Sequence, residues 1–206
     1  MTGYFGKVST HGDFVTRRLP ADLVQAWDRW LQACLQASRA QLGAKWLDAY
    51  LTSPVWRFAV APGVLGRDGL GGVVMPSVDR VGRYFPLTIA ATGAPPLLDW
   101  VQRHGAWFDA IDELARASLD PAFLLGQFDT APEPDVASAP VPAGTASATW
   151  LALDGDVTAA VAAAALQGHS LWWSEAAPGA GAPLLVCRGM PRPDAFAGML
   201  DGFKHR

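Results

Sequence analysis

Three segments with strand character follow one another between residues 55 and 93, and only short connections separate them. Their sequences are VWRFAVAPG, VVMP and YFPLTIAATG. The connection between the first two segments, GRDGLGG at residues 66–72, is predicted to be a flexible hairpin turn. Strands joined by short turns must pair antiparallel, because a parallel pair needs a long crossover. This region therefore predicts a largely antiparallel sheet. Pro86 cannot donate a ladder hydrogen bond, which favours an edge strand or a bulge in the third segment.

Helical patterns surround the predicted strands. Pro20 opens the first helix, whose apolar residues recur every three or four positions, as expected for a helix that lies against a sheet. Residues 45–51, 97–118 and 193–203 carry further helical patterns, while SLWWSE and PLLVCRGM near the C-terminus indicate more strands. We expect an α+β fold in which helices flank a largely antiparallel or mixed β-sheet, built as a single domain over residues 1–206.

Residues 130–149 interrupt this pattern with Thr, Ala, Pro, Glu, Ser and Gly and almost no large apolar side chain. A segment of this composition buries little surface, so we predict a mobile surface loop. The part of the chain that follows is too small to build a core alone. The loop therefore does not divide the chain into independent domains.

The overall composition excludes several classes of protein. Half of the residues are hydrophobic and 17% are charged, as in a globular core, and the net charge of −3 gives phosphate-backbone binding little support. The N-terminus lacks the apolar core of a signal peptide, and no apolar run approaches the roughly 20 residues that span a bilayer. Cys34 and Cys187 lie outside any CxxC motif, which argues against a disulfide scaffold or a zinc site. We expect a cytoplasmic protein that binds no nucleic acid, metal or cofactor and does not insert into membranes.

The connection between the second and third strand segments raises a separate question. Residues 76–88, PSVDRVGRYFPLT, place three charges inside an apolar run, where charges cost free energy unless they lie in a turn, pair, or serve a site. In a structural interpretation, Asp79 bonds the turn backbone, Gly82 supplies a positive φ angle and Arg83 pairs with Asp79. An exposed pair of this kind contributes about 0–1 kcal/mol to stability.

A functional interpretation assigns the same charges to a polar site. Ser77, Asp79, Arg80 and Arg83 would meet the N-terminal turn, residues 9–13, at one rim of the sheet. Arginine is suited to bidentate recognition of carboxylate and phosphate groups. Such a site would bind a partner protein or an anion.

Ser77, Asp79 and His11 also admit an enzymatic interpretation, as a hydrolase or an anion-handling protein. No GxSxG motif surrounds Ser9 or Ser77, no two histidines have metal-ligand spacing, and no phosphate-binding loop is present. A trio of this kind arises by chance in a chain of this length. The residues therefore favour binding over catalysis.

Several longer motifs occur together in one known family. They follow in the order GYFGKVSTHGDFVTRRLP, the WxxW of Trp27 and Trp30, SPVWRFAVAPGVLG, GVVMPSVDRVGRYFPLT, SLWWSE and LLVCRGMPRPDAFAGML. With these motifs the chain resembles TagF, the type VI secretion system-associated family, over almost its whole length. The part from SPVWRF to GRYFPLT is highly specific to that family.

The resemblance implies a cytoplasmic accessory protein of a bacterial contractile secretion apparatus. Members of the family look like post-translational repressors of secretion, which bind the forkhead-associated (Fha) scaffold protein of the system and catalyse no reaction. A PppA-type protein phosphatase is a second partner that the resemblance suggests, since some relatives are fused to one or work beside one. The alternatives are an enzyme or anion-binding protein that uses Ser77, Asp79 and His11, and a structural subunit of the secretion apparatus.

A repressor of this kind needs a docking surface rather than a nucleophile. We expect that surface to be made, or held in shape, by polar residues that are concentrated in the family motifs, together with one tryptophan. These residues are Asp13, Arg17, Trp56, Arg57, Ser77, Asp79, Arg80 and Arg83.

Overall fold

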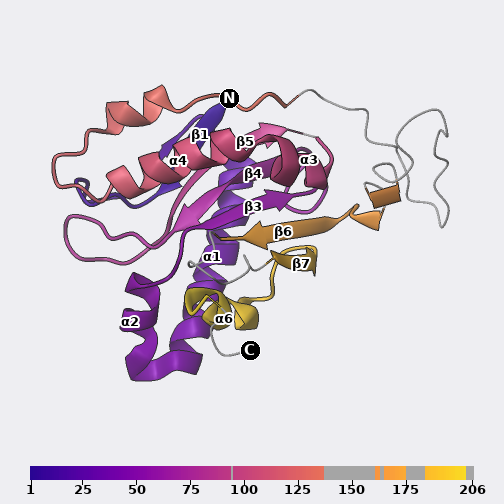
Figure 1. The fold of residues 1–206 in the computed structure, drawn as a ribbon. Helices are drawn as coiled ribbons and strands as arrows, with labels where there is room; N and C mark the ends of the chain where they lie inside the picture. The colour runs from indigo at the N-terminus through magenta and orange to yellow at the C-terminus, as the bar shows by residue number, and fades with distance from the viewer. Residues whose placement is uncertain (94, 137–160, 163–164, 175–183, 203–206) are drawn as a thin grey trace, which may run out of the picture.

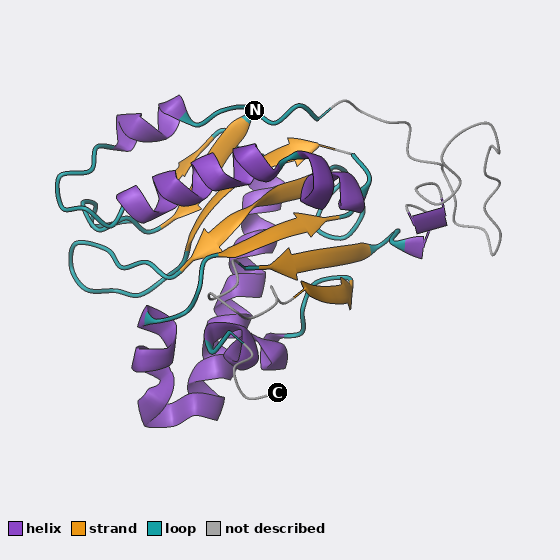
Figure 2. Cartoon of the chain, in the orientation of Figure 1, coloured by secondary structure: helices purple, strands orange, loops and turns teal. Residues whose placement is uncertain are grey.

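The computed structural model describes residues 1–93, 95–136, 161–162, 165–174 and 184–202. In this part of the chain, seven strands form one sheet in the order β2-β1-β5-β4-β3-β6-β7, and all neighbouring strands are antiparallel (Figures 1 and 2). The strands are β1 (Thr2–Gly6), β2 (Val15–Arg17), β3 (Trp56–Val60), β4 (Gly69–Met75), β5 (Leu87–Gly93), β6 (His169–Trp173) and β7 (Leu184–Arg188). The predicted α+β fold with a largely antiparallel sheet is confirmed.

Helices cover both faces of the sheet (Figure 1). Helices α3 and α4 lie on one face, and α1 lies on the other and extends beyond the sheet to meet α2 and α6. The helices are α1 (Ala21–Leu42), α2 (Trp46–Leu51), α3 (Leu97–Arg103), α4 (Gly105–Ala117) and α6 (Phe196–Leu200), with short 3₁₀ helices η1 (Gly43–Lys45), η2 (Leu125–Thr130) and η3 (Pro193–Ala195). No helix in the described residues is both long and apolar enough to cross a bilayer.

The sheet carries a hydrophobic core on each face, because successive residues of a strand point to opposite sides. On β3, Trp56, Phe58 and Val60 belong to the core shared with α1, whereas Ala59 belongs to the core shared with α3 and α4. The apolar stripe predicted for the first helix is confirmed, and its buried members are Leu23, Trp27, Leu31, Cys34 and Leu35. Burial raises the pKa of the Cys34 thiol to about 12.

The glycine-rich segment 66–72 is not a flexible connection throughout, because its second half forms the start of the central strand β4. Gly71 shows why glycine is needed there. A Cβ atom at this position would lie 2.6 Å from Cε3 of Trp100, whose ring packs flat on the strand from α3. The prediction of a turn was wrong here because the sequence does not distinguish a glycine that leaves room for a neighbouring ring from a glycine that permits a turn.

Two further predictions are corrected by the positions of Pro86 and His104. Strand β5 starts after Pro86 and lies between β1 and β4 with continuous register, so it is neither an edge strand nor bulged. The helical pattern over 97–118 is split into α3 and α4 at His104. The buried His104 ring lies 3.0 Å from the carbonyl oxygens of Asp99 and Asp135, so the chain turns around it instead of continuing as one helix.

The predicted loop at 130–149 falls mainly outside the described residues, so the mobility of 137–149 stays a prediction. The first, described part of this segment is hydrogen-bonded to β1 and α4. The carbonyl of Pro132 accepts hydrogen bonds from Oγ1 of Thr2 at 2.6 Å and from Nε1 of Trp107 at 2.9 Å. The segment therefore leaves η2 along β1 and α4.

Candidate functional site: a polar corner between two loops

The loop between β4 and β5, residues 76–86, is organised around one aspartate. The Oδ1 atom of Asp79 accepts hydrogen bonds from the backbone N–H groups of Val81 at 3.0 Å and Arg83 at 2.9 Å. The Asp79 carbonyl accepts a bond from the N–H of Gly82, which has a φ angle of 86°. Glycine adopts this left-handed conformation without strain. The turn chemistry predicted for Asp79 and Gly82 is confirmed.

A buried lysine, which the sequence reasoning missed, completes the charge pairing. Nζ of Lys7 and Nε of Arg83 both donate to Oδ2 of Asp79, the latter at 2.7 Å. The Lys7 and Asp79 side chains are only 5% and 0% exposed. The only signal in the sequence was a lone lysine beside apolar residues at the end of β1. We call Lys7, Asp79, Arg80 and Arg83 the polar corner.

The hydrogen bonds around Asp79 determine its ionisation. Burial of the carboxyl group raises its pKa, but the bonds from Lys7, from the N–H and Nε groups of Arg83, and from the N–H of Val81 outweigh burial and hold the pKa well below its usual range. Asp79 is therefore a carboxylate at neutral pH, and four donors engage its two oxygens. Such a group anchors a loop and is a poor proton acceptor.

Further bonds join the β4–β5 loop to the turn between β1 and β2. The N–H of Arg80 donates to the carbonyl of His11 at 2.9 Å, and Nη2 of Arg83 donates to the carbonyl of Gly12. Oγ of Ser77 donates to the carbonyl of Lys7 at 2.7 Å. The two segments therefore form one tied unit at the left end of the sheet in Figure 1.

Tyr50 of α2 is hydrogen-bonded to the β4–β5 loop at Ser77. Its hydroxyl accepts a hydrogen bond from the N–H of Ser77 at 3.0 Å and donates to the carbonyl of the same residue at 2.9 Å. The Tyr50 side chain is fully buried, and this burial raises the pKa of its hydroxyl, which stays protonated and able to donate. Helix α2 and the β4–β5 loop are thus coupled through one side chain.

We expect Tyr50→Phe to lower the free energy of unfolding by about 1–3 kcal/mol, because the buried N–H of Ser77 loses its acceptor. Amide hydrogen exchange at Ser77 should also become faster. Tyr84→Phe is the matched control, since the half-buried Tyr84 makes no hydroxyl hydrogen bond to the described residues. Equal stabilities of the two variants in urea unfolding would contradict the bridging role of Tyr50.

The tip of the β4–β5 loop faces outward. Val81 is 65% exposed, and no carboxylate among the described residues lies within ion-pair distance of the exposed Arg80. The Arg83 side chain is 58% exposed despite its bond to Asp79. On the neighbouring turn, Asp13 is exposed, and its Oδ1 accepts a bond from the N–H of Phe14 at 2.8 Å. The predicted residues Asp13, Ser77, Asp79, Arg80 and Arg83 are therefore brought together.

The other three predicted residues make their contacts in other parts of the protein. Nη1 of Arg17 on β2 lies 2.8 Å from Oδ2 of Asp129. Nε1 of the buried Trp56 donates to the carbonyl of Met199 at 3.0 Å, on the α1 side of the sheet.

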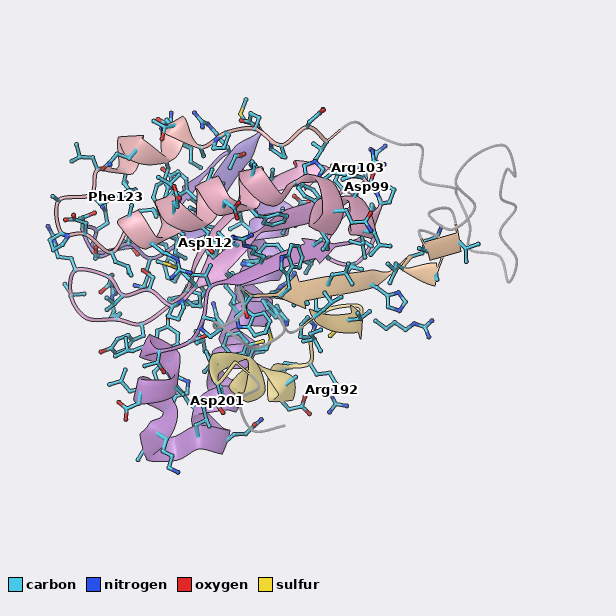
Figure 3. The ribbon with its side chains drawn as sticks, viewed as in Figure 1. Asp99, Arg103, Asp112, Phe123, Arg192 and Asp201 are labelled. Atoms are coloured by element: carbon cyan, nitrogen blue, oxygen red, sulfur yellow. The ribbon has the colours of Figure 1, made fainter. Side chains whose placement is uncertain are left out.

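Arg57, the next residue on β3, points to the opposite face. Its Nη2 lies 2.8 Å from Oδ1 of Asp109 and 3.6 Å from Oδ2 of Asp112, which Figure 3 labels on α4. Arg57 is nearly buried and binds a helix to the sheet. The structure thus brings five of the eight predicted residues together and places the other three elsewhere, and the role of all eight in binding a partner stays a prediction.

The serine, aspartate and histidine of the enzymatic interpretation are not linked as a proton relay. Ser77 is buried and donates to the Lys7 carbonyl, while Nδ1 of His11 lies 3.0 Å from Oγ1 of Thr10. No group of three His, Cys, Asp or Glu side chains in the described residues could hold a metal ion.

Comparisons with known proteins agree with this architecture. A sequence profile described as "TagF N-terminal domain, Type VI secretion system-associated" matches residues 3–133, which is more than half of the chain. The chain is also similar to the crystal structure of PA0076 from Pseudomonas aeruginosa PAO1, with 39% sequence identity and a TM-score of 0.86. The similarity covers 98% of this chain and 94% of that protein. No curated protein matches the chain. The profile contains both loops of the polar corner, and the chain belongs to the TagF family of type VI secretion system-associated proteins.

Proposed function

We propose that the protein is a non-enzymatic, cytoplasmic repressor of a bacterial type VI secretion system, which acts after translation by binding the Fha scaffold protein. The polar corner is its docking surface. Membership of a type VI secretion system-associated family supports the proposal that the protein acts on this secretion system. A PppA-type phosphatase is a second proposed partner, which would act in the same regulatory step.

One observation carries this proposal: the exposed tip of the β4–β5 loop is held in place by a buried ion pair. Lys7 and Asp79 are buried and paired, whereas Arg80 and Val81, one and two residues later, are exposed. A rigid surface loses little conformational entropy when it docks, which favours affinity. Arginine is also among the residues that most often dominate the energy of protein contacts.

The state of Ser77 and Asp79 favours sequestration over catalysis. A nucleophile needs a free hydroxyl and an adjacent base, but Ser77 donates to a backbone carbonyl and Asp79 already accepts four hydrogen bonds. A buried carboxylate with a lowered pKa does not accept a proton readily at neutral pH.

We expect Arg80→Ala to weaken co-purification with the cognate Fha scaffold by about tenfold, because a central arginine contact is commonly worth more than 1 kcal/mol. Its thermal stability should remain close to wild type, since the Arg80 side chain has no ion pair in the described residues. Pull-down from bacterial lysate and thermal unfolding measure the two effects.

Arg67→Ala is the matched control, because Arg67 is an exposed arginine in the β3–β4 hairpin at the opposite end of the sheet. Arg83→Ala should weaken binding and also lower stability slightly, since Nε of Arg83 binds Asp79. Equal capture of the scaffold by the Arg80 and Arg67 variants would remove the polar corner from the docking surface. A wild-type protein that captures no scaffold would refute the proposed function itself.

A further inference from the structure

The polar corner carries an excess of positive charge on an acidic chain. Lys7 and Arg83 pair with one buried anion, Asp79, and Arg80 adds a third cation beside them, whereas the whole chain has a net charge of −3. Lys7 is buried against Asp79, so the charge that remains available to a partner belongs to the two arginines. Their chemistry selects anionic groups, and the guanidinium of Arg80 makes no hydrogen bond or ion pair to the described residues, which leaves its donors available to a carboxylate.

Both guanidinium groups lie beside Gly12. Nη2 of Arg83 donates to the Gly12 carbonyl, and a Cβ atom at Gly12 would lie 3.7 Å from Nη2 of Arg80. Two residues further along the turn stands Phe14, which is 43% exposed. The cationic groups therefore adjoin an exposed aromatic ring within one short turn.

Phe14 forms one wall of a small groove. The groove has a volume of about 240 Å³ and is lined by Phe5, Phe14 and five residues of α1, among them Val24 and Asp28. The Phe14 ring is fixed by stacking on Phe5 at 5.6 Å and by an edge contact with Phe85 at 4.8 Å. Small-molecule sites occupy about 300–1,000 Å³, so a groove of this size suits a single side chain.

We propose that the polar corner and the Phe14 groove together bind an acidic segment of the Fha scaffold, whose carboxylates pair with Arg80 and Arg83 and whose neighbouring apolar side chain enters the groove. This inference rests on the proposed function and adds the chemistry of the partner. Charge complementarity selects the acidic residues, and the apolar wall made by Phe5 and Phe14 selects the anchor.

The carboxylates around the site determine how such a segment lies. Asp28 stands in the groove and accepts a hydrogen bond from Nε2 of Gln32 at 2.7 Å, and Asp13 is exposed on the adjoining turn. Both repel a second carboxylate at the groove end. The acidic residues of the segment therefore lie toward Arg80, and its apolar residue lies toward Phe14.

The test uses a photo-crosslinking amino acid in place of Val81, which lies between the arginines and is exposed, in the full-length protein mixed with the intact Fha scaffold. We expect the crosslinked scaffold peptide, identified by mass spectrometry, to contain Asp or Glu beside an apolar residue. The same amino acid in place of Arg67 serves as the control and should give no crosslink. Arg80→Glu should weaken binding by about tenfold or more, and Phe14→Ser should weaken it without removing its salt dependence.

Several results would overturn the inference. These are a crosslink to a scaffold segment without acidic residues, a crosslink to a second copy of this chain, and scaffold binding that Arg80→Glu leaves unchanged. Loss of binding after phosphatase treatment of the scaffold would identify a phosphorylated segment instead. In the first and third cases, and with untreated scaffold in the phosphatase experiment, the scaffold is still bound, so the proposed function stands. A wild-type protein that binds no scaffold refutes the function itself.

Discussion

Asp79→Asn should lower the melting temperature by about 10 °C, because it breaks a buried ion pair and leaves the charge of Lys7 without its partner. The carboxylate accepts four hydrogen bonds, from Lys7, Val81 and twice from Arg83. Asparagine keeps one acceptor oxygen, and its amide group faces donors on the other side. Thermal unfolding at pH 7 measures the loss.

The pH dependence of this effect follows from the lowered pKa of Asp79. The ordinary pKa is 3.8, and the folded-state pKa lies well below it, so the unfolded chain binds a proton first as the pH falls. The stabilisation is fully present above the ordinary pKa and is lost as the pH decreases toward the folded-state pKa. The difference in stability between the wild type and Asp79→Asn should therefore be constant near neutral pH and shrink below about pH 4.

Asp13→Asn is the matched control, because Asp13 is an exposed carboxylate on the adjoining turn with one local hydrogen bond. It should leave the melting temperature nearly unchanged. Adding Lys7→Met to Asp79→Asn should recover part of the loss, since it removes the unpaired cation. A melting temperature of Asp79→Asn within about 2 °C of wild type would show that the buried pair is not the anchor of the loop.

Trp100→Ala should lower the free energy of unfolding by about 3–5 kcal/mol, the usual cost of removing a large buried aromatic side chain. Trp100 is fully buried on α3, where its ring packs against Trp107 and covers Gly71. Gln102→Ala on the same helix is the control, because Gln102 is exposed. Urea unfolding of both variants measures the difference, and equal values would contradict the burial of Trp100.

A double-mutant cycle tests the contact between Gly71 and Trp100 directly. Gly71→Ala alone should cost about 1–3 kcal/mol, because its Cβ would overlap the Trp100 ring. In the Trp100→Ala background the space is open, so the same substitution should cost much less. If the two losses simply add, close packing of the ring is not the reason for glycine at this position.

The features of the fold that depend on local chemistry could be predicted from the sequence. Strand segments with short connections imply antiparallel pairing, and apolar residues spaced by three and four imply the buried face of α1. Asp79 and Gly82 were also readable, because an aspartate that bonds the next backbone groups and a glycine with positive φ act within five residues. Each of these signals depends on neighbours along the chain.

The candidate site was predictable only in part for the same reason. Arg80 and Arg83 lie within four residues of Asp79, so the turn and its charges could be predicted, but nothing nearby in the chain identified Lys7 as the buried partner. The apolar contribution of Phe14 was missed because an exposed aromatic residue has no distinctive spacing. Trp56 and Arg57 shared a specific motif with the site, yet they point to opposite faces of β3.

Local spacing and turn chemistry thus define the elements, their order and the shape of the β4–β5 loop. Long-range packing decides the rest: β5 lies inside the sheet between β1 and β4, Gly71 receives the Trp100 ring, and Lys7 meets Asp79 across 72 residues of chain. The physical reason is that burial and charge pairing depend on which surfaces come into contact when the whole chain folds. The sequence around a residue does not indicate a contact partner that is distant in the chain.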